Sequence, residues 1–128
     1  MMGKTAITSE NAPKPPANFS QAVRKGNILQ VAGAVAFDPA TNEIVGDDVV
    51  SQTRQVFKNL TALLDEAGSS FADAVMVRVY LTDTSHFAAF NEVYNELIGE
   101  APHAARTTVY VGLPAGLLVE IDVLAVLD

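Results

Sequence analysis

Apolar residues recur at two different spacings along this chain, and each spacing marks one kind of element. Between residues 53 and 67 they repeat every three or four positions, which places them on one face of an amphipathic helix. Asp47 or Asp48 can cap the start of this helix, and Gly68 can end it. The face comprises Thr53, Val56, Phe57, Leu60, Leu63, Leu64 and Ala67.

The same spacing returns after residue 83 and predicts a second helix. Asp83, Thr84 or Ser85 can cap its start, and Gly99 with Pro102 ends it. Its apolar face comprises Phe87, Phe90, Val93, Tyr94 and Leu97.

Alternation of apolar and polar residues, or a short apolar run, predicts the strands. Residues 74–81 alternate, which predicts a strand with Val75, Val77, Val79 and Leu81 on one face. Residues 28–37 are nearly all apolar, as in a strand that is buried on both faces. One face of that strand is predicted to carry Leu29, Val31, Gly33, Val35 and Phe37. Further strands are predicted at 19–23, 107–111 and 117–127, with turns at 26–27, 38–42 and 113–116.

Gly33 lies inside the second of these strands and has two interpretations. It can mark a β-bulge or a tight packing point, because glycine in a strand usually serves backbone geometry. It can also mark a place where a ligand approaches the backbone.

The predicted order is strand, strand, helix, strand, helix, strand, strand. This order indicates an α+β fold, with a mixed sheet and two helices packed on one face. The opposite face is also apolar in places, where it carries Ile28, Ala32, Ala34, Leu124 and Val126. A single layer of two helices cannot cover both faces, so a partner subunit is expected on the second face.

Length and composition narrow the class of protein. The 128 residues, 49% of them apolar, fit a single domain over 1–128 with one core. Residues 1–18 are polar and rich in proline, and are predicted to form an extended arm without a helix. No apolar run of about 18 residues indicates a transmembrane helix, and the start lacks the apolar stretch of a signal peptide. A cytoplasmic protein without membrane contact is therefore expected.

Charge and residue types argue against several functions. The net charge of −7 repels phosphate backbones, so nucleic-acid binding is not expected. The absence of cysteine excludes disulfides, thiolate metal sites and a cysteine nucleophile. The two histidines, His86 and His103, lack a suitable set of partner ligands, so no metal site is expected.

Arg106 is the candidate binding residue that the charge pattern singles out. From Val79 to Asp128 it is the only Lys or Arg, against seven acidic residues. A guanidinium group can hold a planar carboxylate through two parallel hydrogen bonds, which makes Arg106 a candidate anion site. The alternative is that Arg106 forms an ion pair with one of those acids at a strand edge.

Six segments carry a family likeness. In order they are NFSQAV, GNILQVAGAVAFDPATNEIVG, QTRQVFKNLTALLDEAGSS, VYLTDTSHFAAFNEVYNE, AARTTVYVGLP and VEIDVLAV. Together they resemble the Rid family (reactive intermediate deaminases, also called the YjgF family) from about Phe19 to Val126. No single segment is decisive, but six in register at compatible spacing are specific.

The resemblance implies a fold, an assembly and an activity. The fold is chorismate-mutase-like, and the assembly is a homotrimer whose sheets form a central β-barrel with ligand clefts between subunits. The activity is that of a 2-iminobutanoate/2-iminopropanoate deaminase-like hydrolase, which converts enamines and imines such as 2-aminoacrylate to 2-keto acids and ammonia. The implied ligand is a small imine that bears a carboxylate, and no cofactor is implied.

The resemblance also assigns residues. Arg106 matches the family arginine that holds the substrate carboxylate, and Glu120 matches the acid expected to position or activate water. Gly33 matches a glycine whose backbone lies at the ligand pocket. Asn91 matches a residue near the cleft, and Thr108 falls where a backbone N–H can reach the ligand.

Three positions depart from the family pattern. Phe19 stands where many members have a tyrosine whose hydroxyl reaches the ligand or a water, and phenylalanine cannot make that hydrogen bond. Ala104 replaces a proline, and Ala34 replaces a frequent glutamine. The change at Phe19 therefore points to a different substrate or a lower rate.

Imine hydrolysis needs an activated water, and Glu120 can act as its general base. Glu120 and Asp122 lie two apart on one strand face, roughly 7 Å from each other by strand rise. Like-charge repulsion over that distance can raise the pKa of one carboxyl. The alternative is a solvated face, or pairing with a cation of a neighbouring strand. With the resemblance, Glu120 is interpreted as functional and Asp122 as structural.

Two other functions remain as alternatives. The same reaction could serve a pathway-specific substrate of the aminomuconate or 3-aminoacrylate type, which the change at Phe19 favours. A non-catalytic trimer that binds small carboxylates or regulates a partner is the second alternative. A ribonuclease activity, also described for family members, is disfavoured by the acidic charge.

Overall fold

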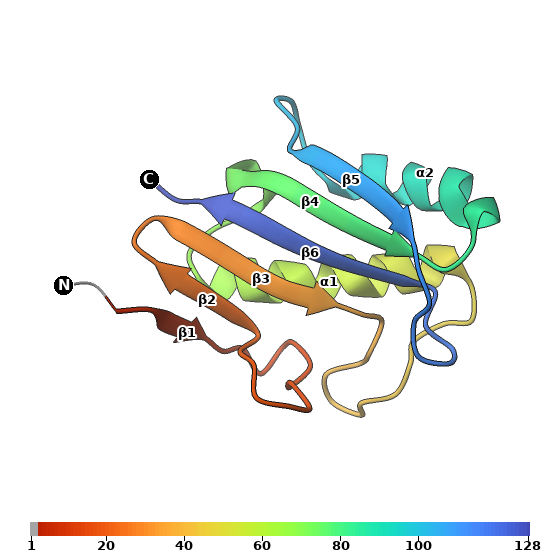
Figure 1. Cartoon of the computed structure of the whole chain (residues 1–128), viewed down its shortest axis with the longest axis horizontal. Coiled ribbons are helices and arrows are strands. Elements are labelled where there is room, and N and C mark those ends of the chain that lie inside the picture. Colours follow the sequence, from red (N-terminus) through yellow and green to blue (C-terminus); the bar gives the residue numbers. More distant parts are fainter. Residues whose placement is uncertain (1–2) are drawn as a thin grey trace.

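The computed structural model describes residues 3–128, and its centre is one six-stranded sheet with both long helices on the same face (Figure 1). In chain order the elements are β1 (Thr5–Ile7), β2 (Ala22–Lys25), β3 (Ile28–Ala34), α1 (Val49–Glu66), the 3-10 turn η1 (Phe71–Asp73), β4 (Ala74–Leu81), the 3-10 turn η2 (Thr84–His86), α2 (Phe87–Leu97), β5 (Ala105–Tyr110) and β6 (Val119–Val126). The strands lie in the order β1-β2-β3-β6-β4-β5. Of the strand pairs within residues 3–128, only β4 and β5 are parallel, so the sheet is mixed and the predicted α+β architecture is confirmed.

Local sequence signals explain where the helices begin and end. Of the two aspartates proposed as the cap of α1, Asp48 accepts a hydrogen bond from the Ser51 backbone N–H at 2.7 Å. After the helix, Gly68 adopts a positive φ of 71°, which glycine tolerates without a steric penalty. Asp83 caps η2 through the Ser85 backbone N–H at 2.8 Å, and η2 leads directly into α2.

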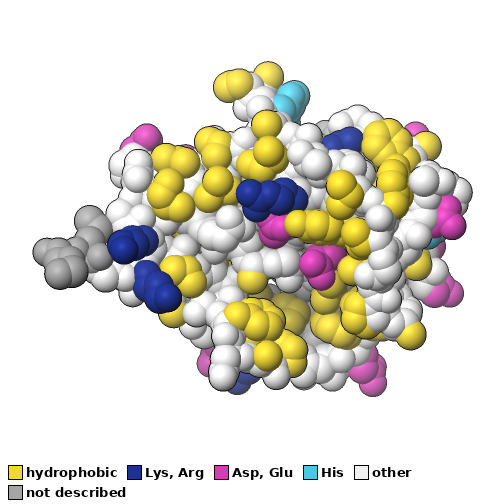
Figure 2. Space-filling model, viewed as in Figure 1, with side chains coloured by type: hydrophobic (Ala, Val, Ile, Leu, Met, Phe, Trp, Pro, Cys, Tyr) yellow, Lys and Arg dark blue, Asp and Glu magenta, His cyan; other side chains and the backbone are white. Residues whose placement is uncertain are grey.

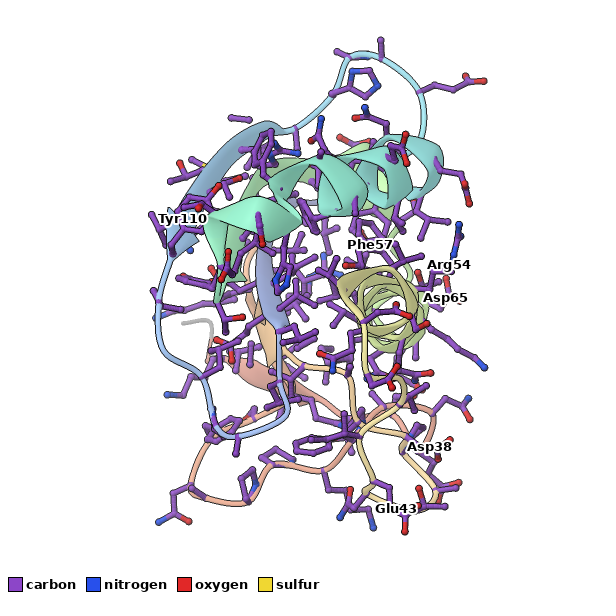
Figure 3. All side chains as sticks on the ribbon, turned by 90° about the vertical axis from the view of Figure 1, so that its right-hand side faces the viewer. Asp38, Glu43, Arg54, Phe57, Asp65 and Tyr110 are labelled. Carbon is purple, nitrogen blue, oxygen red and sulfur yellow. The ribbon has the colours of Figure 1, made fainter. Side chains whose placement is uncertain are left out.

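The core lies between the sheet and the helices. Alternate residues of the three central strands are fully buried on this side: Leu29, Val31, Val77, Val79, Leu81, Val119, Ile121, Val123 and Ala125. Seen from the side, α1 and α2 lie on one side of the sheet, and Phe57 points from α1 toward α2 (Figure 3). Its ring packs edge-on against Tyr94 of α2 at 5.9 Å. Burying each large apolar side chain stabilises the fold by about 1.5–3 kcal/mol.

Two β-bulges overturn parts of the predicted burial pattern. The register shifts between Ala74 and Met76, so Val75 turns away from the core and is 47% exposed. A second shift lies between Val31 and Ala34, and it confirms the bulge interpretation of Gly33. The predicted face is therefore wrong beyond Gly33, because the next buried side chain is Ala36 and not its neighbours at 35 and 37.

The prediction that β3 is buried on both faces is wrong for the single chain. Leu29 and Val31 are fully buried toward the helices, whereas Ile28 on the other face is 44% exposed. The face of the sheet opposite the helices, called the open face below, carries Ile28, Gln30, Met76, Arg78, Tyr80, Val109, Glu120, Asp122, Leu124 and Val126. Figure 2 shows this face with apolar side chains spread over it and a few charged side chains near its centre.

Strand boundaries differ from the predicted ones where pairing with distant segments decides them. β2 begins at Ala22, so Phe19 precedes the strand, and β5 begins at Ala105, so Arg106 lies within it. β6 is shorter than predicted at both ends. No helix among residues 3–128 combines the length and apolar character that crossing a membrane requires.

The predicted arm contributes a strand of its own. β1 pairs antiparallel with β2, which the sequence pattern did not predict, while residues 1 and 2 of the arm lie outside the described residues. The buried side chain of Gln21 holds the arm in place. Its amide nitrogen donates to the carbonyl oxygens of Ser9, Ala12 and Pro13, and its oxygen accepts from the Ser9 backbone N–H at 2.8 Å.

Candidate active site

The predicted site residues fall into two groups on opposite faces of the sheet. Arg106 pairs in register with Val77, whose side chain points toward the helices. Glu120 pairs in register with Tyr80 and belongs to the open face. Within one chain, the structure therefore does not bring Arg106 and Glu120 together.

Arg106 is held by aromatic rings and one amide. Its Nη1 donates a hydrogen bond to Asn91 Oδ1 at 2.7 Å. Its guanidinium carbon lies 4.5 Å from the ring centre of Tyr94, and 5.7 Å from those of Phe87 and Phe90. Cation–π contacts of this kind favour a charged, flat guanidinium in a fixed orientation. We call these three rings with Asn91 the arginine cradle.

Among residues 3–128, no acidic side chain forms an ion pair with Arg106. In the part of the chain that the structure describes, the ion pairs are Arg54–Glu96 at 2.6 Å and Arg78–Asp122 at 3.0 Å. The predicted alternative, an ion pair of Arg106 with an acid at a strand edge, is therefore wrong. The guanidinium keeps most of its five donors for an anion.

A hollow of about 310 Å³ opens beside Arg106, lined by Tyr94, Asn95, Ile98, His103, Ala104 and Arg106. The Tyr94 hydroxyl is buried without a hydrogen-bond partner, and burial raises its pKa while the charge of Arg106 opposes the shift. Thr108 lies two residues beyond Arg106 on the same face, and its hydroxyl is also buried and unpartnered. Within the described residues, the surroundings of Arg106 therefore combine its positive charge with two buried hydroxyl groups and no counter-charge.

Glu120 lies on the bulge at Gly33. A Cβ atom added at Gly33 would lie 2.7 Å from Glu120 Oε2, so only glycine lets the carboxylate rest against the backbone here. Burial raises the pKa of the half-buried Glu120 carboxyl, and the negative charge of Asp122 raises it further. A carboxyl with a raised pKa inside a cavity is a candidate general base.

Asp122 is hydrogen-bonded to two neighbouring side chains on the open face. It accepts hydrogen bonds from Arg78 Nη1 at 3.0 Å and from the Tyr80 hydroxyl at 2.9 Å. Within residues 3–128, Glu120 has no such partner. The interpretation of Asp122 as structural is supported by these bonds, and Glu120 remains available for chemistry.

A hollow of about 540 Å³ adjoins Glu120 on the open side of the bulge. Its walls come from the proline-rich arm, the β3 bulge, α1 and the segment before β6. Phe19 lies on this wall and is 53% exposed, and apolar side chains border the hollow in Figure 2. We call it the Glu120 pocket.

The structure thus groups Asn91 and Thr108 with Arg106, and groups Gly33 and Phe19 with Glu120. Sequence reasoning missed the rings of the arginine cradle, which it interpreted only as the apolar face of a helix. A signal was present, since positions 87, 90, 91 and 94 share one helix face. Among residues 3–128 no three His, Asp or Glu side chains gather so that they could hold a metal ion.

Substitution of Gly33 by alanine is expected to lower activity without destabilising the fold. The backbone at Gly33 does not need a positive φ, and the atom that must move is the end of a flexible side chain, so unfolding should change little. The Glu120 carboxylate would be displaced, and any activity that depends on it should fall about tenfold or more. Thermal unfolding and steady-state kinetics measure the two effects.

Gly112 provides the matched control, because an added Cβ there meets nothing within 4 Å. Gly112→Ala should leave both unfolding and activity unchanged. Full activity in Gly33→Ala would contradict a role for the placement of Glu120.

These features define a class of protein: a small α+β protein with an arginine that has no acidic partner among residues 3–128 and a half-buried carboxyl beside a pocket. The family model described as Endoribonuclease L-PSP matches residues 9–127. A RutC family protein of Pyrococcus horikoshii is 46% identical over 122 residues, which cover 95% of this chain and 97% of that protein. A 2-iminobutanoate/2-iminopropanoate deaminase of Dermatophagoides farinae is 33% identical over 129 residues, with full coverage of both chains.

A solved structure agrees with these relatives. A member of the conserved Rid protein family from Yersinia pestis superposes with a TM-score of 0.93 at 35% identity, covering 98% of this chain and 100% of that one. The chain belongs to the Endoribonuclease L-PSP family, which is the YjgF or Rid family. The resemblance inferred from the six sequence segments is confirmed.

Proposed function

We propose that this protein is an enamine/imine deaminase that hydrolyses small 2-imino acids to 2-keto acids and ammonia. The observation that carries the proposal is Arg106, whose guanidinium is held by aromatic rings and has no acidic partner in the described part of the chain. Such a group suits the carboxylate that every 2-imino acid bears. The relative from Dermatophagoides farinae, named 2-iminobutanoate/2-iminopropanoate deaminase, supports the same reaction.

The proposal requires more than one chain at each site. Arg106 and Glu120 lie on opposite faces of one sheet, so a single chain cannot present both to one small imine. We propose a homotrimer in which the open faces form a central β-barrel, and Arg106 of one subunit faces Glu120 of another across a cleft. The exposed apolar side chains of Ile28 and Val109 on the open face support such an interface.

The chemistry follows from these two groups. Arg106 binds the substrate carboxylate and fixes the adjacent C=N carbon. Glu120 accepts a proton from water while the water oxygen bonds to that carbon, and the imine nitrogen takes the C=N π electrons and a proton from solvent, which forms a carbinolamine. Glu120 then passes its proton to the amine, the C–N bond breaks as ammonia leaves, and the C=O bond forms as the carbinolamine hydroxyl releases its proton to solvent. An enamine reaches the same path after it tautomerises to the imine. No metal or organic cofactor enters these steps, and a cytoplasmic location remains a prediction.

A coupled assay tests the proposal. A serine dehydratase generates 2-aminoacrylate, and the rate of imine loss is followed with and without this protein. Acceleration by the protein supports deaminase activity. If the folded protein gives no acceleration, the result favours one of the two alternatives: a deaminase with a pathway-specific substrate, or a trimer that binds small carboxylates without catalysis.

The dependence of rate on pH is expected to follow Glu120. Because its pKa is raised, the rise of kcat/KM on the acid side should lie above the range of an ordinary glutamate. Glu120→Gln should lower kcat/KM about 100-fold and abolish that rise. Exposed Glu96, changed to Gln, should leave the profile unchanged.

The raised pKa of Glu120 also makes stability depend on pH. As pH rises through this pKa, kcat/KM is expected to increase and the stability of the fold to decrease. The folded state binds the Glu120 proton more tightly than the unfolded state, so Glu120 lowers stability as pH rises through its raised pKa. Glu120→Gln should therefore have a higher Tm than the wild type at pH 7, and the difference should vanish near pH 4. A lower Tm at pH 7 would contradict the burial of an ionised Glu120.

A further inference from the structure

Helix α1 buries polar side chains in a core that is otherwise apolar. Gln52, Thr53 and Asn59 are each fully buried. The Thr53 hydroxyl donates at 2.6 Å to the Val49 carbonyl oxygen, one turn earlier in the same helix, so its bond is local. The two amides instead reach outside the helix. Because a buried amide is stable only where it finds partners, the segments that these side chains bind indicate what each amide holds in place.

Gln52 binds the segment that leads into β6. Its Oε1 accepts a hydrogen bond from the Leu118 backbone N–H at 2.8 Å, shortly before Glu120 in the chain. Its Nε2 donates to the carbonyl oxygens of Gly116 at 2.8 Å and Gly46 at 3.1 Å. These bonds use the oxygen and the N–H groups of the amide together. Gln52 therefore fixes the backbone from which the strand of Glu120 starts.

Asn59 binds the segment that follows the β3 bulge. Its Nδ2 donates to the carbonyl oxygens of Val35 at 3.0 Å and Phe37 at 2.9 Å, just beyond the bulge glycine. Its Oδ1 accepts from Gln55 Nε2 at 2.9 Å, one turn earlier on α1, which orients the amide. Asn59 therefore fixes the backbone on the glycine side of the contact with Glu120.

Both segments have irregular backbone where the amides bind. The pairing of β3 with β6 shifts between Val31 and Ala34, and β3 ends at Ala34. Gly116 has a positive φ of 90° in the loop before β6. Peptide groups outside a regular ladder need other partners, and the two amides supply them. Gln52 and Asn59 lie about two turns apart on one face of α1, so a single helix holds both segments.

The placement of Glu120 depends on these two segments. Among residues 3–128 its carboxylate has no hydrogen-bond partner, and a Cβ added at Gly33 would lie 2.7 Å from its Oε2. A carboxylate without a partner is placed by the backbone that carries it and by the backbone against which it rests. All the bonds of Gln52 and Asn59 lie within one chain, so they do not depend on what covers the open face.

We infer that Gln52 and Asn59 are positioning residues for Glu120. Through these amides, α1 holds the start of β6 and the end of the β3 bulge at the spacing that rests the carboxylate on the bulge glycine. The inference rests on the proposed deaminase function, in which Glu120 acts on water. Both amides act through the backbone and not on the substrate itself. A misplacement of about 1 Å at a catalytic group can cost about 100-fold in rate, so their effect on turnover is measurable.

Apolar replacements of the same size test the inference. Gln52→Met and Asn59→Leu remove the amides, so each folded variant is expected to lower kcat/KM in the coupled assay about tenfold or more. Affinity for pyruvate, measured by NMR titration, should stay within about twofold of the wild type, because Arg106 binds the carboxylate. The pKa of Glu120, followed by carbon-13 NMR, should fall toward that of an ordinary glutamate as the carboxyl leaves its half-buried position. Glu120→Gln identifies its resonance.

Thr53→Val provides the matched control, because it removes a buried polar group from the same helix without touching either segment. It should leave kcat/KM and the pKa of Glu120 unchanged. Should an apolar variant fail to fold, Gln52→Asn or Asn59→Gln is measured in its place. These variants keep the amide but change its reach by one methylene, and the same losses are expected.

A folded Gln52→Met or Asn59→Leu protein with the kcat/KM of the wild type and an unchanged pKa of Glu120 would overturn the inference and leave the proposed function intact. An equal loss in Thr53→Val would overturn it as well, since the effect would then follow from any buried polar group of α1. A wild-type protein that does not accelerate imine loss would overturn the proposed function. The pKa of Glu120 in the variants would still decide whether the two amides place its carboxyl.

Discussion

Replacement of Arg106 by lysine is expected to lower kcat/KM for 2-imino acids about 10- to 100-fold, and replacement by alanine is expected to abolish measurable turnover. Lysine keeps the charge but loses the planar pair of donors, and a hydrogen bond to a charged group contributes about 1.5–3 kcal/mol. Lysine also stacks less well on the ring of Tyr94, which lies 4.5 Å from the guanidinium carbon. The coupled imine assay measures the rates, and circular dichroism reports whether each variant folds.

Arg54 offers a control of the same residue type. It pairs with Glu96 between α1 and α2, and both side chains are about half exposed. Surface pairs of this kind contribute about 0–1 kcal/mol, so Arg54→Ala should change Tm slightly and kcat/KM not at all. Full turnover by a folded Arg106→Ala protein would remove the observation on which the deaminase proposal stands.

Mixing two impaired variants, Arg106→Ala and Glu120→Gln, is expected to restore part of the wild-type activity. If each cleft takes Arg106 from one subunit and Glu120 from another, every trimer that contains both variants has a native pair in one of its three clefts. The opposite placement of the two side chains on the sheet is the reason for this expectation. The variants are co-expressed with two different tags, the doubly tagged oligomer is isolated, and its turnover is compared with the wild type.

A second mixture controls for changes in folding. Arg106→Ala combined with Arg106→Lys places a defect on the same side of every cleft, so it should show no more activity than the lysine variant alone. A doubly tagged oligomer of the first mixture that stays inactive would argue against a site shared between subunits. A monomeric wild-type protein with full activity would do the same.

The sequence was sufficient for the elements whose signals are local. The cap at Asp48 and the positive φ at Gly68 depend on residues within one turn, and they mark the ends of α1 as predicted. Asp83 caps the 3-10 turn η2 and not α2 itself, whose first turn follows His86 without a side-chain cap. β4 was predicted with both of its ends, because its alternation continues over eight residues. Strands that depend on distant partners were predicted less well, and β1 was missed, since three residues carry no periodic signal.

The candidate site was likewise predicted only as far as local signals in the sequence allowed. Residue type and charge pattern were enough to single out Arg106, and the family resemblance added Glu120, Gly33, Asn91, Thr108 and Phe19. Tertiary structure decided the face on which each one lies. A bulge reverses the side of every residue beyond it, and pairing across strands sets which acid is bound and which is free.

Asp122 and Glu120 show how tertiary structure, and not the sequence pattern, sets which acid is paired. The two acids are indistinguishable by spacing and charge, yet Arg78 and Tyr80 engage only Asp122. The Glu120 pocket likewise needs the arm, the β3 bulge and α1 to meet, although these segments are far apart in sequence. Residue chemistry and local order could be predicted from the chain because they depend on near neighbours. The placement of Arg106 and Glu120 on opposite faces of the sheet could not be predicted from the chain. It depends on strand register, which long-range packing selects.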